Sequence, residues 1–371
     1  MILLALLQIY SLIARRGFVP PPRAPRVRNG RRKRVNLALQ GGGAYGAFTW
    51  GVLDQLLADG RLDIEAISGT SAGAVNSVML ADGLDRGGPE EARKRLAEFW
   101  RAVSVDGHLP DLQRAVVERL FPFVSREALW LSPLSRFLSP YDLNPLNINP
   151  FRELIERFVD FEALRNAPGI ELFISATNVH TGEVRIFRRE ELTVEMIMAS
   201  ACLPLLFRAV EIDGVPYWDG GYSGNPALVP FLNHTRSEDV LIVQINPRER
   251  RKTPMRTREI LGRMNEINFN AALLSELRAV DFVNHLIDEG RLPRGTAKGE
   301  FRRLKLHRIV MPDLGESPGA PSKMSREFQS FEALHKHGQR ATRRFLDAHF
   351  ADIGRHSTMD TPVEAEAELV E

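Results

Sequence analysis

A chain of 371 residues with 44% hydrophobic and 26% charged side chains can bury a sizeable core, and this balance excludes a disordered chain. Its single cysteine, Cys202, excludes an intramolecular disulfide and any zinc site built on several cysteines, and it fits a reducing compartment. The net charge of +2 is uneven: residues 1–53 hold nine basic and no acidic residues, so the remainder carries −7. Because the body lacks a basic face with aromatic side chains or a reading motif, nucleic acid is not expected as a partner.

Residues 1–34 form an apolar and basic leader. Residues 2–14 are an apolar run of 13 residues, shorter than the roughly 20 that cross a bilayer as a helix, and residues 15–34 are rich in proline and arginine. Two interpretations stay open. A short apolar segment beside a polybasic stretch is typical of a peripheral membrane anchor, which predicts a cytoplasmic protein held on the inner membrane face. The other interpretation is a dispensable leader.

From Val35 onward, apolar patterning predicts short buried strands that alternate with helices. Such alternation is typical of an α/β domain with a mainly parallel sheet, which we place at residues 35–250. The expected strands are 35–39, 64–68, 170–177, 215–218 and 240–245, and the expected helices are 47–57 and 72–80.

Three further segments differ from this pattern. Residues 107–150 are rich in proline and aromatic side chains, which predicts a covering subdomain or lid, with an ordinary packed subdomain as the alternative. Residues 251–355 are expected to be a helical C-terminal region, with helices at 256–287 and 325–350 and a Pro/Gly/Ser linker at 313–323. Residues 356–371 are expected to be an acidic, disordered tail.

The strongest chemical motif is Gly69-Thr70-Ser71-Ala72-Gly73, between a predicted strand and a predicted helix. A G-x-S-x-G at such a turn places the serine on a sharp bend that glycines permit. The serine hydroxyl then projects at a helix N-terminus, where free N–H groups favour developing negative charge. Ser71 is therefore the candidate nucleophile.

A second glycine-rich turn, Gly41–Gly46, also follows a strand and precedes a helix. Its G-x-G-x-x-G spacing raises a dinucleotide-binding interpretation, which needs an acidic residue at the end of the second strand. Asp63 instead precedes that strand. We therefore favour an anion hole in which the N–H groups of Gly42 and Gly43 face Ser71, each donor stabilising an oxyanion by about 3–4 kcal/mol.

A third motif, Asp219-Gly220-Gly221, follows the strand-like residues 215–218. An Asp-Gly pair alone is most often a turn. Together and in this order, however, the three motifs resemble the patatin-like phospholipases over roughly residues 35–245, and the run from Ala199 to Phe207 adds to the resemblance. The residues that carry it are Gly41, Gly42, Gly43 and Gly46, then Gly69, Ser71 and Gly73, then Asp219 and Gly220.

The resemblance implies a three-layer α/β sandwich and a serine acyl-hydrolase that cleaves carboxylic esters of lipids, as a phospholipase A, a lysophospholipase or a lipid esterase. It implies a catalytic dyad in which Ser71 attacks the ester carbonyl and Asp219 takes its proton. The backbone of Gly41, Gly42 and Gly43 would form the oxyanion hole, and neither a metal nor an organic cofactor is implied. The C-terminal region resembles the helical extension of a bacterial subgroup.

One departure concerns Tyr45, which stands where the family often has arginine or lysine, so a cation beside the oxyanion hole is expected to be missing. This leaves headgroup preference open, and sequence does not specify chain length or acyl position. The nine histidines also leave a Ser-His-Asp triad open. Two other functions remain as alternatives: a catalytically silent membrane-associated scaffold and a nicotinamide-dependent oxidoreductase.

Overall fold

The protein, seen in a computed structural model, is built on one mixed eight-stranded sheet. The structure describes residues 32–104, 139–143, 147, 149–204, 206–250, 253–255, 257–295, 297, 299–313, 323 and 325–359. The strands are β1 (Lys33–Leu39), β2 (Leu62–Thr70), β3 (Glu171–Asn178), β4 (Val184–Arg188), β5 (Val210–Ile212), β6 (Val215–Asp219), β7 (Asp239–Gln244) and β8 (Lys305–Val310).

The strand order is β5-β6-β3-β2-β1-β7-β8, and β4 pairs with β3 outside this path. Strands β3, β2, β1, β7 and β8 pair in parallel, whereas β4, β5 and β6 pair antiparallel. The expected α/β fold with a mainly parallel sheet is confirmed. Because parallel strands point the same way, the ends of β1 and β2 lie at one edge, where the two glycine motifs follow them.

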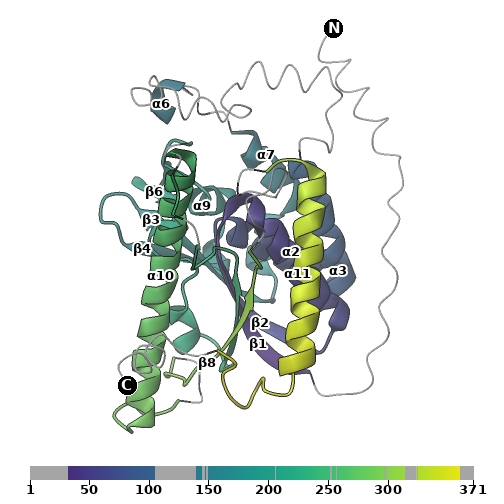
Figure 1. Ribbon diagram of the computed structural model, residues 1–371, viewed down its shortest axis with the longest axis vertical. Helices are drawn as coiled ribbons and strands as arrows, with labels where there is room; N and C mark the ends of the chain where they lie inside the picture. The colour runs from purple at the N-terminus through teal and green to yellow at the C-terminus, as the bar shows by residue number, and fades with distance from the viewer. Residues whose placement is uncertain are drawn as a thin grey trace. The chain divides into compact units, whose positions relative to one another are not determined.

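Helices cover both faces of the sheet (Figure 1). On one side lie α2, α3 and α11, and α10 lies on the other, which makes three layers. The helices are α2 (Gly46–Asp59), α3 (Ala72–Val103), α6 (Pro140–Leu143), α7 (Pro150–Phe158), α8 (Phe161–Asn166), α9 (Val194–Ser200), α10 (Thr257–Asp288) and α11 (Phe328–His349). The short 3-10 turns are η1 (Gly43–Tyr45), η3 (Arg189–Glu191), η4 (Gly220–Tyr222) and η5 (Val229–Leu232).

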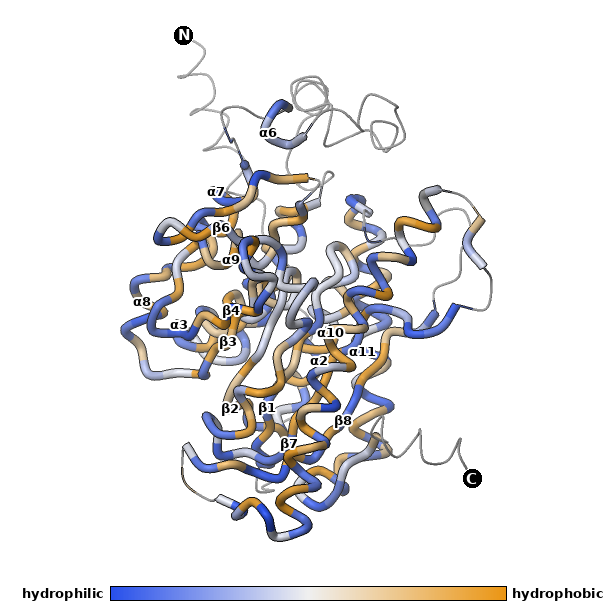
Figure 2. Tube along the Cα trace, turned by 90° about the vertical axis from the view of Figure 1, so that its left-hand side faces the viewer, coloured by the Kyte–Doolittle hydropathy of each residue, from blue (hydrophilic) through white to orange (hydrophobic). Residues whose placement is uncertain are grey.

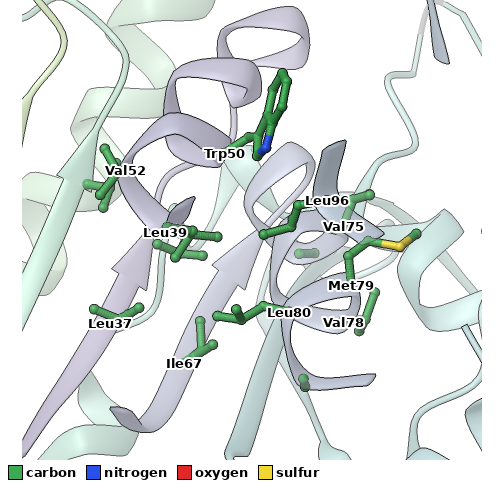
Figure 3. Close-up of a cluster of buried hydrophobic side chains, with 14 of the residues drawn as sticks. Leu37, Leu39, Trp50, Val52, Ile67, Val75, Val78, Met79, Leu80 and Leu96 are labelled. Carbon is green, nitrogen blue, oxygen red and sulfur yellow. The ribbon is translucent and has the colours of Figure 1, made fainter. Parts of the chain in front are cut away.

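The pleat of the strands divides the core into two hydrophobic clusters. In β1, Leu37 and Leu39 face the cluster formed with α2 and α3, whereas Ala38 faces the cluster formed with α10. Figure 3 shows Leu37, Leu39 and Ile67 beside Val75 and Leu80 of α3. Figure 2 shows the same strands as largely hydrophobic along the trace. Burial on both faces explains why these strands read as continuous apolar runs in sequence.

The C-terminal region is part of the sandwich. The predicted helices are confirmed as α10 and α11, but the strand β8, which sequence patterning did not predict, extends the sheet beside β7. The apolar pattern of β8 is interrupted by Lys305, His307 and Arg308, and sequence patterning therefore does not indicate a strand there. Helix α11 packs closely on α2, since an added Cβ on Gly338 would lie 2.2 Å from the carbonyl oxygen of Phe48.

Four predicted segments fall largely outside the described residues. These are the leader up to residue 31, the predicted lid apart from residues 139–143, 147, 149 and 150, the linker apart from Asp313 and Lys323, and the acidic tail beyond residue 359. Helix α3 continues far beyond the predicted end at residue 80, with a kink where Gly88 has φ 74° before Pro89. Across the described ranges, no helix combines the length and apolar character needed to cross a membrane.

Candidate active site

Ser71 occupies a strained turn between β2 and α3. Its backbone has φ 54° and ψ −119°, a conformation that a non-glycine residue adopts only when its surroundings impose it. The flanking glycines make this turn possible, because a Cβ on Gly73 would lie 2.1 Å from the carbonyl oxygen of Leu39, and one on Gly69 would lie 2.7 Å from the carbonyl of Gly73. The Ser71 N–H donates to Ser200 Oγ at 2.9 Å. The predicted strand–serine–helix geometry is present.

Asp219 ends β6 at the same edge of the sheet. It is fully buried, its N–H donates to the carbonyl oxygen of Cys202 at 2.8 Å, and its Oδ1 accepts the N–H of Gly221 at 2.8 Å. Gly220 is required because a Cβ there would lie 2.2 Å from the carbonyl oxygen of Ser175. The turn after β6 therefore holds the carboxylate in one orientation.

The carboxylate of Asp219 is placed against Ser71. Burial raises the pKa of Asp219 to about 7, while the Gly221 amide, the Ser71 hydroxyl and the charge of Lys323 act in the opposite direction. Its Oδ2 nevertheless has no partner with hydrogen-bond geometry among the described atoms, so the Ser71 contact is not a closed hydrogen bond. Loose contacts of this kind are common in resting active sites. A carboxylate with a pKa near neutrality is suited to accept and return a proton.

The glycine turn after β1 lies beside Ser71. A Cβ on Gly41 would lie 2.8 Å from Ser71 Cβ, and one on Gly46 would lie 2.7 Å from Ala72 Cβ, so both positions require close backbone approach. The Gly41 N–H, expected in the oxyanion hole, instead donates to Asn225 Oδ1 at 2.7 Å.

The two following amides remain available. Gly43 has φ 59°, a left-handed conformation that glycine adopts readily. The N–H groups of Gly42 and Gly43 have no hydrogen-bond acceptor within the described residues. Two amides without acceptors, presented beside a serine, can receive a developing negative charge.

The two competing interpretations find little support in this geometry. Asp63 lies at the start of β2, where its carboxylate is 3.8 Å from Arg34, and not at the strand end that would meet a ribose. Of the histidines within the described ranges, none contributes to the pKa of Asp219. His307 pairs with Asp239 at 3.0 Å, and the triad alternative therefore has no histidine in place among those described.

The family comparison adds to this geometry. A model of the family described as patatin-like phospholipase matches residues 37–232, which is more than half of the chain. The chain belongs to the patatin-like phospholipase family. All three motifs from the sequence lie within the matched residues. Lipid hydrolysis is thus the class of activity that family membership supports.

Solved structures are similar to this patatin-like chain at low identity. VipD from Legionella pneumophila has a TM-score of 0.38 and 14% identity, over 85% of this chain and 67% of its own. The ExoU–SpcU complex of the Pseudomonas aeruginosa type III secretion system has a TM-score of 0.35 and 16% identity, over 85% of this chain and 52% of the matched chain. This chain thus spans about two thirds and about half of those two chains. No curated protein sequence matches it.

The patatin-like site contains residues that sequence reasoning missed. Ser200 and Asn225 hold the backbone of Ser71 and Gly41, and both lie far away in sequence from the residues they contact. The most unexpected is Lys323, from the predicted linker: its carbonyl oxygen accepts the Ala44 N–H at 3.0 Å, and its charge acts on Asp219. The expectation that Tyr45 leaves no cation beside the oxyanion hole stays a prediction, because it is the backbone of Lys323 that contacts this turn.

A cavity of about 450 Å³ adjoins the Asp219 strand. Its wall includes Cys202, whose carbonyl accepts the Asp219 N–H, and Tyr141 from the described part of the predicted lid. Neither Ser71 nor Asp219 itself lines it. The cavity mixes apolar and charged side chains, among them Tyr141, Phe151, Met198, Cys202, Phe207 and Arg208. Within the described part of the chain, no group of three or more His, Cys, Asp or Glu side chains is placed to hold a metal ion.

Proposed function

We propose that this protein is a serine acyl-hydrolase that cleaves carboxylic esters of lipids with Ser71 as nucleophile and Asp219 as general base. The observation that carries the proposal is the strained Ser71 turn placed against a fully buried carboxylate with a pKa near 7. Burial explains why an aspartate can do work that histidine usually does, because its proton affinity is raised to the range where a base is effective at neutral pH.

The reaction follows from these groups. Asp219 takes the proton of Ser71 Oγ as that oxygen bonds to the ester carbonyl carbon, and the carbonyl oxygen becomes an oxyanion. The amides of Gly42 and Gly43 donate to this oxyanion. Collapse of the intermediate breaks the bond to the leaving alcohol, which takes the proton from Asp219. Water then attacks the acyl-enzyme, Asp219 accepts its proton, and release of the fatty acid returns that proton to Ser71.

The direct test compares two substitutions with matched controls. Ser71→Ala should abolish covalent labelling by a fluorophosphonate and hydrolysis of a p-nitrophenyl ester, whereas Ser77→Ala, six residues further along the chain in α3, should keep both. Asp219→Asn should lower turnover by roughly 10³-fold, whereas Asp213→Asn, the same change on an exposed hairpin turn, should have little effect.

Other outcomes select the alternatives. A folded wild-type protein that neither reacts with the fluorophosphonate nor hydrolyses any ester would favour the silent scaffold. One histidine as essential as Ser71 would favour a triad over the dyad. Binding of a nicotinamide cofactor would favour the oxidoreductase.

Two finer aspects belong to the same proposal. The cavity beside Cys202 is a candidate acyl pocket, and its wall includes Tyr141, Asn147 and Asn149 from the predicted lid. A change in this wall, such as Phe207→Ala, should then alter chain-length preference more than reactivity with a short ester. Peripheral membrane association through residues 1–34, on the cytoplasmic membrane face, would keep the enzyme near its substrate.

A further inference from the structure

Lys323 and Asp219 present two buried atoms of opposite charge that both lack a partner. The ammonium nitrogen of Lys323 and the Oδ2 oxygen of Asp219 have no hydrogen-bond partner within the part of the chain that the structure describes. Burying a polar group without a partner is costly, and more so when it is charged. Buried polar atoms without partners are often retained because function requires them, and both of these atoms belong to the candidate active site.

The backbone of Lys323 is attached to the glycine turn. Its carbonyl oxygen accepts the Ala44 N–H at 3.0 Å and lies 2.7 Å from where a Cβ on Gly43 would stand. Its side chain extends across the Phe269 ring, with the nitrogen 5.2 Å from the ring centre. A residue from the C-terminal region thus contacts the proposed oxyanion hole through its backbone, and through its side chain the ring of Phe269, which packs against Gly221 in the turn after Asp219.

The neighbouring charges are already paired. Glu266 of α10 accepts Arg250 at 2.7 Å and Arg263 at 3.2 Å, and Arg250 also faces Asp313 at 3.7 Å. Even so, Glu266 attracts the Lys323 ammonium more strongly than Asp219 does, and Arg250 repels it. The ammonium forms no hydrogen bond with either carboxylate.

Among the residues that the structure describes, Lys323 is the one cation that acts on Asp219. The other titratable side chains near it are the Cys202 thiol and the Tyr222 phenol, and burial raises the pKa of both, so they stay neutral. Lys323 has a pKa lowered to about 8 by burial and still carries its charge at neutral pH.

We propose that Lys323 is a positioning residue of the reaction centre, whose ammonium keeps Asp219 in the carboxylate form that accepts the Ser71 proton. This inference rests on the proposed function. Without the cation, a fully buried aspartate would hold its own proton more tightly and fewer molecules would carry an active base at neutral pH.

The test is the pH profile of kcat/KM for a soluble ester. Lys323→Met, which keeps the length and removes the charge, should move the acid midpoint upward by about half a pH unit, because the Gly221 amide and the Ser71 hydroxyl still stabilise the carboxylate. Its deficit should be largest below pH 7 and should close above pH 9, where wild-type Lys323 is itself neutral. Lys323→Arg should keep the wild-type acid midpoint. An equal loss at every pH, or an unmoved midpoint, would overturn the proposal.

A second readout separates this inference from the proposed function. The free energy of unfolding at pH 7.5 is measured for Lys323→Met, Asp219→Asn and the double variant. A favourable coupling between the two sites supports the charge pair even when the protein hydrolyses no ester, and additive effects overturn it. If Lys323→Met does not fold, Lys323→Gln takes its place in both measurements.

A separate observation concerns the N-terminal part of α10 and the residues before it. Met264 and Ile267 are 54% and 51% exposed, although the opposite side of the same turns is buried. Residues 260, 264 and 267 lie on one face, since they are spaced by four and three positions. Exposed apolar clusters of this kind mark interaction surfaces. The exposed apolar surface consists of Met255, Ile260, Leu261, Met264 and Ile267.

This exposed apolar surface adjoins the site. Phe269, two residues beyond Ile267, contacts the turn after Asp219, because a Cβ on Gly221 would lie 2.5 Å from its ring and its centre is 5.8 Å from that of Tyr222. In sequence, residues 248–263 contain seven basic and two acidic side chains, and five basic ones remain besides Arg250 and Arg263, which pair with Glu266. An apolar stripe flanked by excess positive charge complements an anionic lipid surface.

We infer that this exposed apolar surface docks on anionic lipid and brings the site to its substrate, an inference that also rests on the proposed function. The probe is binding to vesicles of phosphatidylcholine with phosphatidylglycerol. The double change Met264→Gln with Ile267→Gln should weaken binding tenfold or more and leave hydrolysis of a soluble ester unchanged. Phe282→Gln, on the same helix and 64% exposed, is the matched control and should bind as wild type.

Three results would overturn the docking inference. Equal loss of binding in the control and the double variant would show a general apolar effect. Unchanged vesicle binding, with conversion of a dimer to a monomer, would assign the surface to a second copy of the chain. Unchanged binding with no change of oligomeric state would assign it to a covering segment of the same chain.

Discussion

Replacing Asp219 by asparagine should stabilise the protein, and by an amount that depends on pH. Burial raises the folded-state pKa of Asp219 to about 7, against about 3.9 for an unfolded aspartate. The stability that follows from this raised pKa is fully present below the unfolded value and is lost as pH rises through 7. At about 1.36 kcal/mol per unit, the loss between pH 5 and pH 8 is about 3 kcal/mol. Asparagine has nearly the same shape but does not ionise, so the stability of the variant does not include this pH-dependent loss.

The free energy of unfolding of Asp219→Asn, minus that of wild type, should therefore be larger at pH 8 than at pH 5 by up to about 3 kcal/mol. The figure is an upper value because Lys323 loses its attraction to the carboxylate in the variant. Urea unfolding of both proteins at the two pH values measures it, and all other titrations cancel in the difference. Ser71→Ala, which keeps the carboxylate, is the control, and its stability should depend on pH at least as steeply as that of wild type, since the lost hydroxyl lowers the pKa of Asp219. A difference that does not change with pH would refute the buried, ionised aspartate.

Three further predictions follow from the same structure. For a soluble ester, kcat/KM should fall about tenfold per pH unit below pH 7, since Asp219 must be ionised; an acid limb near pH 4 would contradict this. Gly73→Ala should prevent folding or abolish activity because its Cβ would meet Leu39, whereas Gly262→Ala, in open space within a helix, should stabilise by up to about 1 kcal/mol in thermal unfolding. A truncated chain beginning at Arg32 retains all of β1 and should hydrolyse a soluble ester at the full rate but bind anionic vesicles more weakly; undiminished binding would leave the leader dispensable.

Local signals predicted most of the fold. The strands β1, β2, β3 and β7 were predicted because two-sided burial makes each a short apolar run between turn residues. Helices α10 and α11 were predicted from their length and period. Where the signal was weak the prediction failed: β8 carries charged residues inside its run, and its place beside β7 depends on the partner strand.

The candidate site shows the same division. Sequence by itself singled out Ser71 and the glycines of its turn, because a sharp turn and close backbone approach demand particular residue types at fixed local spacing. It singled out Asp219 only through the resemblance of the three motifs, taken together, to a known family. Only the tertiary structure decided that the Gly41 amide is occupied by Asn225 and that the charge of a lysine from a distant linker acts on Asp219. Lys323 stands about 100 positions from Asp219, and nothing in a Pro/Gly/Ser-rich stretch distinguishes a lysine that will be buried from one that stays in solvent. Charge and burial act through space, and long-range packing alone brings such groups together.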